Sequence, residues 1–354
     1  MKISILVLGA LLLAGCQKEV IDPQNTATGS PGYNAAGLLT NTANIVVVNY
    51  RALDQQVAAL QAAVGALATA PTPAALATAR QAYRDARLPW ETTEAFAFGP
   101  VSTLGLDAVI DTWPLNRVDL ATLLASTDPL TTTSLARLDG GLQGYHPIEF
   151  LLFGKDAGKP LADFTPREYK LLMASAQNLK ANTAALLNAW LPGGGNFAAT
   201  LATAGPSNTV YPKQKQAVQE LLDGLVGPAD ELANSKIETP LAKQSTEYEE
   251  AEYSQNSKAE FTANLAGIEN IYNGRYGSAG TGVGFGALVV ARSPALDVRF
   301  RQEVADAKTA INTLPGRFDQ AIIQNPAAVR AAQAKVRTVL NTLQNDCVPL
   351  VDAL

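Results

Sequence analysis

Histidine and the sulfur-containing residues are scarce in this chain of 354 residues, which has one histidine, two cysteines and two methionines. The single histidine, His146, argues against zinc sites of the His-Glu-x-x-His type, which draw two histidines from one helix. Any imidazole chemistry must therefore use His146. If Cys16 is modified, as argued next, Cys347 has no partner for an intramolecular disulfide. Burial must then hold the fold, and a hydrophobic content of 47% supplies the material.

Beyond residue 15 the chain has no apolar run long enough to cross a bilayer as a helix. Residues 1–15 join Lys2 to a short apolar core and end in small residues, which is the pattern of a secretory signal peptide. The four residues 13–16, Leu-Ala-Gly-Cys, resemble a bacterial lipoprotein box. We therefore expect cleavage before Cys16 and a lipid anchor on it, which places the protein in the cell envelope, facing the periplasm or at the cell surface. An ordinary signal peptide with a chance cysteine is the alternative.

A basic excess is also missing. The full chain has 27 basic and 32 acidic side chains, and removal of residues 1–15 takes away Lys2 and no acid, which leaves a net charge of −6. A surface of this sign does not favour nucleic acid or anionic head groups. We expect a membrane contact only through the lipid and no nucleic-acid partner.

Clear alternating strand patterns are absent, whereas apolar residues recur at helical spacing in several long segments. One stripe runs through Leu53, Val57, Leu60, Val64 and Leu67. Similar stripes occur over residues 300–314 and 329–347, and residues 165–191 open with Thr-Pro-Arg-Glu, a capping box with proline at the first helical position. The strand-like runs 45–48 and 287–290 are short. The sequence therefore predicts an all-α protein.

Breaks in the pattern divide the chain. Residues 16–43 are polar and rich in glycine, proline and serine, and they predict a flexible tether. Residues 192–212 contain two clusters of glycine, proline and asparagine that interrupt the helical period. We expect one helical bundle over residues 44–192 and another over residues 212–354.

The candidate site lies around His146. Glu149 follows it by three residues, so on a helix both side chains lie on one face and could address one ion or substrate. A structural alternative is that Pro147 starts the helix, His146 caps it and Glu149 bonds back to the cap. A metal centre in this chain must be filled mainly by oxygen donors, a ligand set that suits iron, manganese, calcium or magnesium.

Residues 144–154 contain Gly-x-His-x-x-Glu followed by Phe-Leu-Leu-Phe-Gly, which resembles the signature of the imelysin family. Residues 87–100 are similar to the family's Trp-x-x-x-Glu-Ala-Phe-x-Phe-Gly-Pro block, and residues 111–116 to its Trp-Pro turn. In the second half, residues 253–257 and 264–268 resemble its Tyr/Phe-Ser-x-Asn-Thr and Asn-x-x-Gly-Ile segments. The matches follow the family order. Two departures are Ala251, where the family pattern has serine, and Glu260, where it has aspartate.

The resemblance implies two helical bundles with a cleft between them, in a bacterial envelope protein linked to iron uptake. It implies a divalent metal ion, iron among the possibilities, and a partner protein of iron uptake. Carried over by position, the expected metal ligands are His146, Glu149 and Glu94, and the other site candidates are Ser254, Asn264 and Trp113. Glu91 and Glu94 have the alternative role of an exposed acidic face.

Two other functions stay open at this point. One is a non-catalytic protein that binds a peptide, glycan or haem, suggested by the aromatic residues around the motif. The other is a metallopeptidase, a label that the family carries and that a chain with a single histidine supports poorly. We therefore expect a binding protein rather than an enzyme.

Overall fold

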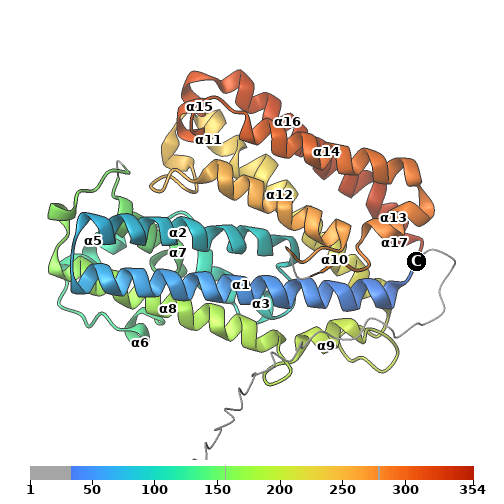
Figure 1. The fold of residues 1–354 in the computed structure, drawn as a ribbon, viewed down its shortest axis with the longest axis horizontal. Coiled ribbons are helices and arrows are strands. Elements are labelled where there is room, and N and C mark those ends of the chain that lie inside the picture. Colours follow the sequence, from blue (N-terminus) through green and yellow to red (C-terminus); the bar gives the residue numbers. More distant parts are fainter. Residues whose placement is uncertain (1–32, 156, 278–279) are drawn as a thin grey trace, which may run out of the picture.

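The computed structural model describes residues 33–155, 157–277 and 280–354 (Figure 1). In these ranges all regular elements are helices, and the β pairing consists of one isolated bridge between Arg275 and Thr281. The prediction of an all-α protein is confirmed, and the strand-like runs 45–48 and 287–290 lie in helices. The expected signal peptide and Cys16 lie outside the described residues.

The first bundle is built on three long helices, α1 (Ala35–Thr69), α2 (Pro73–Thr93) and α8 (Pro166–Trp190), with α2 and α8 packed on α1 (Figure 1). Shorter helices complete it: η1 (Glu94–Phe96), α3 (Pro100–Thr103), α4 (Leu106–Asp111), α5 (Arg117–Ala125), α6 (Thr132–Leu135), η2 (Gly140–Leu142), α7 (Tyr145–Phe153), η3 (Leu161–Asp163) and α9 (Phe197–Ala202).

Four longer helices form the second bundle, α10 (Gln214–Glu231), α12 (Ser257–Asn273), α14 (Pro294–Asn312) and α16 (Pro326–Thr342), which lie above the first bundle in Figure 1. Its shorter elements are η4 (Leu232–Lys236), α11 (Glu238–Lys243), η5 (Thr246–Tyr248), α13 (Gly286–Arg292), α15 (Phe318–Gln324), η7 (Leu343–Cys347) and α17 (Val348–Asp352). Two of them, η4 and η7, are π-helices, each a single wide turn at the end of a long helix.

Helix α1 begins earlier than predicted. The sequence placed residues 16–43 in a tether, but α1 starts at Ala35 after Asn34, whose side chain accepts a hydrogen bond from the Gly37 N–H at 3.0 Å. Leu38 and Leu39 are fully buried. The prediction that the globular part starts near residue 44 is therefore wrong, because the first three turns of α1 are packed core despite their polar composition.

The predicted start of α8 is confirmed in detail. Thr165 is the N-cap, Pro166 is the first helical residue, and the Thr165 hydroxyl accepts from the Glu168 N–H at 3.1 Å while Glu168 accepts from the Thr165 N–H at 2.7 Å. This reciprocal pair satisfies two backbone donors that a helix start leaves without partners. The predicted apolar stripes of α1, α14 and α16 are buried as well.

The bundles meet along α2 and α12, and η1 at the end of α2 packs against α10. Gly267 of α12 makes this close approach possible, because a Cβ at that position would overlap the backbone oxygen of Thr92. We call this contact region between the two bundles the seam. It brings the C-terminal end of α2 against the second bundle.

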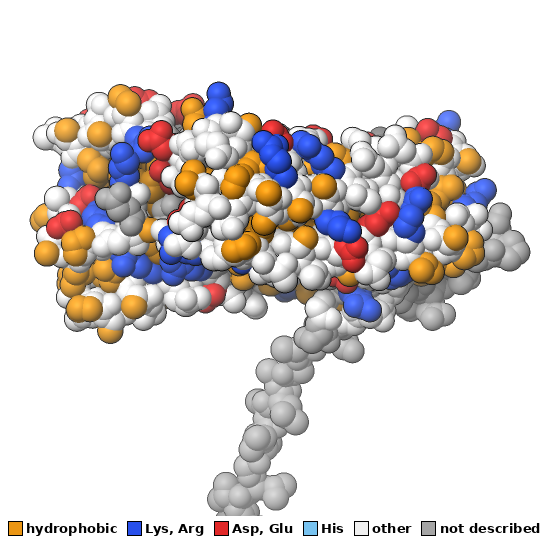
Figure 2. Space-filling view, turned by 90° about the horizontal axis from the view of Figure 1, so that it is seen from above, with side chains coloured by type: hydrophobic (Ala, Val, Ile, Leu, Met, Phe, Trp, Pro, Cys, Tyr) orange, Lys and Arg blue, Asp and Glu red, His pale blue; other side chains and the backbone are white. Residues whose placement is uncertain are grey.

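The outer face of the second bundle is mixed in character. Figure 2 shows basic, acidic and apolar side chains interspersed across it. None of the described helices combines the length and the hydropathy that a bilayer-spanning segment requires. The buried ion pairs between the two bundles lie instead at the seam.

Candidate metal centre

Helix α7 places the histidine motif at the seam. Its N-cap is Gly144, whose φ of +75° is in the region that favours glycine, and a Cβ there would overlap the Ile110 carbonyl. The helix starts at Tyr145, one residue before His146. The alternative in which His146 caps the helix is therefore wrong. No side chain caps the start of α7, so His146 and Glu149 can make contacts at the seam instead.

His146 is 2% exposed and lies between two carboxylates. Its Nε2 is 3.2 Å from Asp111 Oδ1, at the end of α4, and its Nδ1 is 3.5 Å from Glu149 Oε2. Neither contact has the alignment of a hydrogen bond. Burial alone would lower the pKa of His146, but the two carboxylates outweigh it and raise the pKa to about 10. The two carboxylates thus favour the charged form of the imidazole, whose nitrogens have no hydrogen-bond partner within residues 33–155, 157–277 and 280–354.

Glu149 joins the motif to the second bundle. It is fully buried, and its Oε1 accepts a hydrogen bond from the Ser254 N–H at 2.7 Å. The Ser254 hydroxyl and Glu149 Oε2 have no hydrogen-bond partner among the described residues. The structure thus brings together three predicted site residues, His146, Glu149 and Ser254, and gives Glu149 one oxygen for the backbone and one facing the imidazole.

Glu91 and Glu94 lie at the end of α2 and in η1, where Asn264 of α12 binds both. The Asn264 Nδ2 donates to Glu91 Oε2 at 2.8 Å and to Glu94 Oε2 at 2.5 Å. Glu91 is fully buried. The alternative of an exposed acidic face is therefore wrong, since the second bundle covers these carboxylates.

Arg87 is the central cation of the seam. Its side chain is 1% exposed and forms ion pairs with Asp111 and Glu91 of the first bundle. It also reaches Glu250 at 3.0 Å and Glu260 at 3.2 Å in the second bundle. Burial opposes ionisation of the guanidinium, but the surrounding carboxylates hold the pKa of Arg87 well above its usual value.

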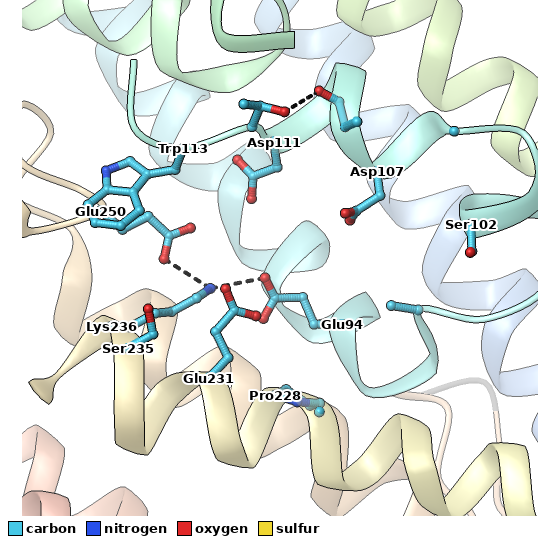
Figure 3. Close-up of a pocket in the computed structure, with 15 residues that line it drawn as sticks. Glu94, Ser102, Asp107, Asp111, Trp113, Pro228, Glu231, Ser235, Lys236 and Glu250 are labelled. Carbon is cyan, nitrogen blue, oxygen red and sulfur yellow. Dashed lines mark hydrogen bonds and ion pairs between the residues drawn. The ribbon is translucent and has the colours of Figure 1, made fainter. Parts of the chain in front are cut away.

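Lys236 is the second buried cation, and it comes from the second bundle. Its Nζ lies 2.9 Å from Glu94 and 3.0 Å from Glu250 (Figure 3). It also lies 2.9 Å from Glu91. Burial by itself would lower the pKa of the ammonium, but Glu250, Glu91 and Glu94 hold the pKa of Lys236 well above its usual value. The ammonium is charged at any physiological pH.

Acidic groups outnumber basic ones in this cluster. Six carboxylates contribute, and they are Glu91, Glu94, Asp111, Glu149, Glu250 and Glu260. Three groups can carry positive charge against them, Arg87, Lys236 and His146. Burial raises the pKa of Glu94 well above its usual range and that of Glu260 to about 7. The cluster therefore has more carboxyl groups than its own cations can neutralise, and Glu94 and Glu260 meet part of that excess by holding protons.

A cavity of about 640 Å³ opens onto this cluster (Figure 3). Its lining includes Glu94, Asp111, Lys236 and Glu250, with Trp113 on one wall. A second chamber of about 50 Å³ contacts His146 and shares two walls with the larger cavity. Those shared walls are Trp113 and Glu250.

Two groups of side chains have the spacing of a metal site. Asp111, His146 and Glu250 form one and Glu91, Glu94 and Asp111 the other, and in each the three ligand atoms lie within 4.8 Å of one another. The donors are carboxylate oxygens and one imidazole nitrogen, which suit Fe²⁺ or Mn²⁺. Of the three predicted ligands, His146 and Glu94 belong to such a group, whereas Glu149 stands behind His146.

Five residues of this cluster had no predicted role, namely Arg87, Asp111, Lys236, Glu250 and Glu260. Arg87 and Asp111 lie within the motif blocks of the first half. The family resemblance therefore pointed to these segments but assigned no role to the two side chains. Glu250 belongs to an acidic pair just before the Ser254 motif. Sequence patterns gave no signal for Lys236, and Glu260 joins the network although it departs from the family pattern.

The buried acids predict a fall in stability as the pH rises. Burial raises the pKa of Glu249, beside the small chamber, to about 8, whereas an unfolded chain titrates glutamate near 4.3. Between these values the folded protein holds more protons than the unfolded one, so raising the pH destabilises it. Glu260, with a pKa of about 7, and His146, with a pKa of about 10, act in the same direction over their own windows.

We expect the melting temperature of the metal-free protein to fall by at least about 5 °C between pH 5 and pH 8.5. Differential scanning calorimetry in a chelating buffer measures it. Glu249→Gln should flatten the slope, because the amide mimics the protonated acid and can still accept from the Ser257 hydroxyl, which lies 2.5 Å from the Glu249 carboxylate. A melting temperature that rises over this range would contradict the assignment.

The chain resembles proteins of one family over most of its length. The family model described as Imelysin matches residues 46–346. Iron-regulated protein A of Synechococcus elongatus is 31% identical over 314 residues, which cover 87% of this chain and 84% of that protein.

Two crystal structures share the helical fold. An iron-regulated protein A precursor from Parabacteroides distasonis is similar with a TM-score of 0.80 at 21% identity, over 94% of this chain and 99% of that one. An imelysin-like protein from Psychrobacter arcticum is similar with a TM-score of 0.75 at 16% identity, over 92% and 98% of the two chains.

Proposed function

The chain belongs to the imelysin family, as its motifs predicted, and from that premise we propose that it binds iron or another divalent cation at the seam between its bundles. The proposed role is in iron uptake, consistent with an iron-regulated protein among its relatives. The lipid anchor at Cys16, a place in the cell envelope and a partner protein that receives the ion are parts of the same proposal.

The observation that carries the proposal is the excess of buried carboxylates at a cavity. Charged groups that are removed from water are costly unless they are paired or bind a metal. The seam holds six carboxylates against three groups of opposite sign, and its ligand atoms already have metal-site spacing. A divalent cation would replace the protons that carboxyls with a raised pKa hold, and would pair with the remaining negative charge.

Asp111, His146 and Glu250 are the best ligand set. Neither nitrogen of His146 has a hydrogen-bond partner in the part of the chain that the structure describes, so its imidazole can turn a lone pair to an ion once it loses its proton. Glu149 then has the supporting role that carboxylates often have behind a metal-bound histidine, since it can accept from the second ring nitrogen. In this proposal His146 is a metal ligand, and Glu149 orients the imidazole of His146 without binding the ion.

The larger cavity suits delivery of a hydrated ion. A water molecule takes about 30 Å³ in the liquid, so a volume of about 640 Å³ exceeds what an ion with six waters needs. The 50 Å³ chamber at His146, in contrast, is far smaller than a haem. This size difference favours a small cation over the haem alternative, and no feature of the described residues favours a peptide, a glycan or peptidase activity over cation binding.

We expect one divalent cation to bind per chain in isothermal titration calorimetry with Mn²⁺, or with Fe²⁺ under anaerobic conditions. His146→Ala and Asp111→Asn should each weaken binding by 100-fold or more, on the order of the loss of a ligand, and Glu149→Gln by about 10- to 100-fold. Asp306→Asn, which removes a carboxylate of an exposed ion pair with Lys335, is the control and should bind as the unmodified protein does. Equal affinity in all four variants would refute the proposal.

A further inference from the structure

Lys236 occupies a position that a bound cation would need. Its ammonium lies 3.0 Å from Glu250, which belongs to the ligand set of Asp111, His146 and Glu250. It also lies 2.9 Å from Glu91 and from Glu94, which form the neighbouring group with Asp111. Divalent ions bind carboxylate oxygens at about 2.0–2.6 Å. An ion and the ammonium on the same oxygens would repel each other strongly at such short range. They therefore compete.

The main chain of Lys236 is fixed, so only its side chain can move away. Lys236 ends the π-helix η4, in which the Ile237 N–H donates to the Leu232 carbonyl at 3.1 Å. Gln333 of α16 braces the same turn, since its Nε2 donates to the Ala233 carbonyl at 2.7 Å. A side chain with four methylene groups on this rigid base can change rotamer without disturbing the seam.

A second place for the ammonium exists in the cavity. Glu231, the last residue of α10, lines the cavity, and its carboxylate points toward Lys236 in Figure 3. It is exposed and has neither a hydrogen bond nor an ion pair among the described residues. A lysine that leaves Glu91 and Glu94 thus finds an unused carboxylate on the same helical segment.

We propose that Lys236 is a built-in competitor which a divalent cation displaces from Glu250, a carboxylate of the best ligand set, and from the neighbouring Glu91 and Glu94, and that Glu231 receives the displaced ammonium. This inference rests on the proposed cation-binding function and adds how the site selects and releases its ion. When the ammonium moves to Glu231, a monovalent ion only restores the charge that it leaves behind at Glu91 and Glu94, whereas a divalent ion raises the positive charge there by one. Lys236 therefore favours multiply charged ions and keeps their affinity low enough for release.

Removal of the competitor should tighten binding. Lys236→Met, which keeps the length of the stem and loses the charge, is expected to raise the affinity for Mn²⁺ on the order of tenfold in calorimetry at constant ionic strength. Lys159→Met is the matched control, because Lys159 is a largely buried lysine paired with Glu168 at 2.7 Å and outside the cavity. Its affinity should stay that of the unmodified chain. An unchanged or weaker affinity in Lys236→Met would overturn the inference.

A double-mutant cycle tests whether Glu231 is the second seat, that is, the carboxylate that receives the displaced ammonium of Lys236. Glu231 is exposed, so its replacement should leave the fold intact. Glu231→Gln should weaken Mn²⁺ binding on the order of threefold or more when Lys236 is present, and should have a smaller effect in Lys236→Met. Equal effects in both backgrounds would show that Glu231 acts on the ion directly and would overturn its role as the second seat.

Replacement of choline by sodium at constant ionic strength tests selectivity. Sodium should weaken Mn²⁺ binding by Lys236→Met more than binding by the unmodified chain, and equal weakening would overturn the charge-selection part.

The two proposals fail in different ways. Binding by the unmodified chain with no gain in Lys236→Met refutes the competitor alone, whereas no binding by either protein refutes the cation-binding function together with it.

Discussion

Arg87→Met is expected to lower the free energy of unfolding by more than about 4 kcal/mol at pH 7.5. A fraction of the variant protein is expected to be unfolded even without denaturant. The guanidinium is 1% exposed and is the shared partner of four carboxylates, two from each bundle. Methionine replaces the volume of the stem but leaves those carboxylates buried without their main counter-charge. Urea denaturation of the metal-free protein, followed by circular dichroism, measures the loss.

Two comparisons identify the cause as charge. Arg299→Met removes an exposed arginine, with a side chain 52% exposed, that pairs with Asp346 and Glu303, and should cost less than about 1 kcal/mol. The deficit of Arg87→Met should also shrink at pH 5, because the carboxyls it leaves unpaired then take up protons. A loss that is the same at both pH values, or no larger than that of Arg299→Met, would show that Arg87 does not balance the seam.

Gly144→Ala should cost about 3 kcal/mol or more and should also abolish cation binding. With φ at +75° and ψ at −147°, Gly144 has a conformation that is strained for any residue with a side chain. The added methyl group would in addition overlap the Ile110 carbonyl, at the end of the α4 segment that carries Asp111. The substitution thus pushes the two sides of the candidate site apart. Thermal unfolding and Mn²⁺ titration report the two effects.

Gly65→Ala is the matched control for this prediction. Gly65 lies inside α1, and a Cβ there meets no atom within 4 Å. Alanine should stabilise the helix by about 0.5–1 kcal/mol and leave binding unchanged. If Gly144→Ala behaved like Gly65→Ala, the approach of α7 to α4 would not position the site.

The helical architecture was predictable where one face of a helix is buried. The stripe from Leu53 to Leu67 and the capping box at Thr165 are local signals, and both are confirmed. The start of α1 was not predictable in this way, because a helix buried on all sides shows no polar face. Asn41 explains the difference, since its Nδ2 donates to the carbonyls of Gly274 and Val283 at 3.0 Å, more than 200 residues away.

Family resemblance, rather than spacing, brought most of the candidate site within reach. Spacing paired His146 with Glu149, and the resemblance added Glu94, Ser254 and Asn264, which the structure also places at the seam. The role of Lys236 depends on partners about 145 residues earlier in the chain and on the π-turn that aims it. No local pattern carries that information, because a lysine after a helix is ordinarily a solvated residue.

At the seam, each half of the chain provides a cation that pairs with carboxylates of the other half. Arg87 of the first bundle neutralises Glu250 and Glu260 of the second, while Lys236 of the second neutralises Glu91 and Glu94 of the first. Taken alone, the first half would lack the cation that pairs with Glu94, and the second half would lack the cation that pairs with Glu260. Fragments cut in the loop before α10 should therefore recognise each other by this reciprocity of charge, and a foreign half without the matching cation should not substitute.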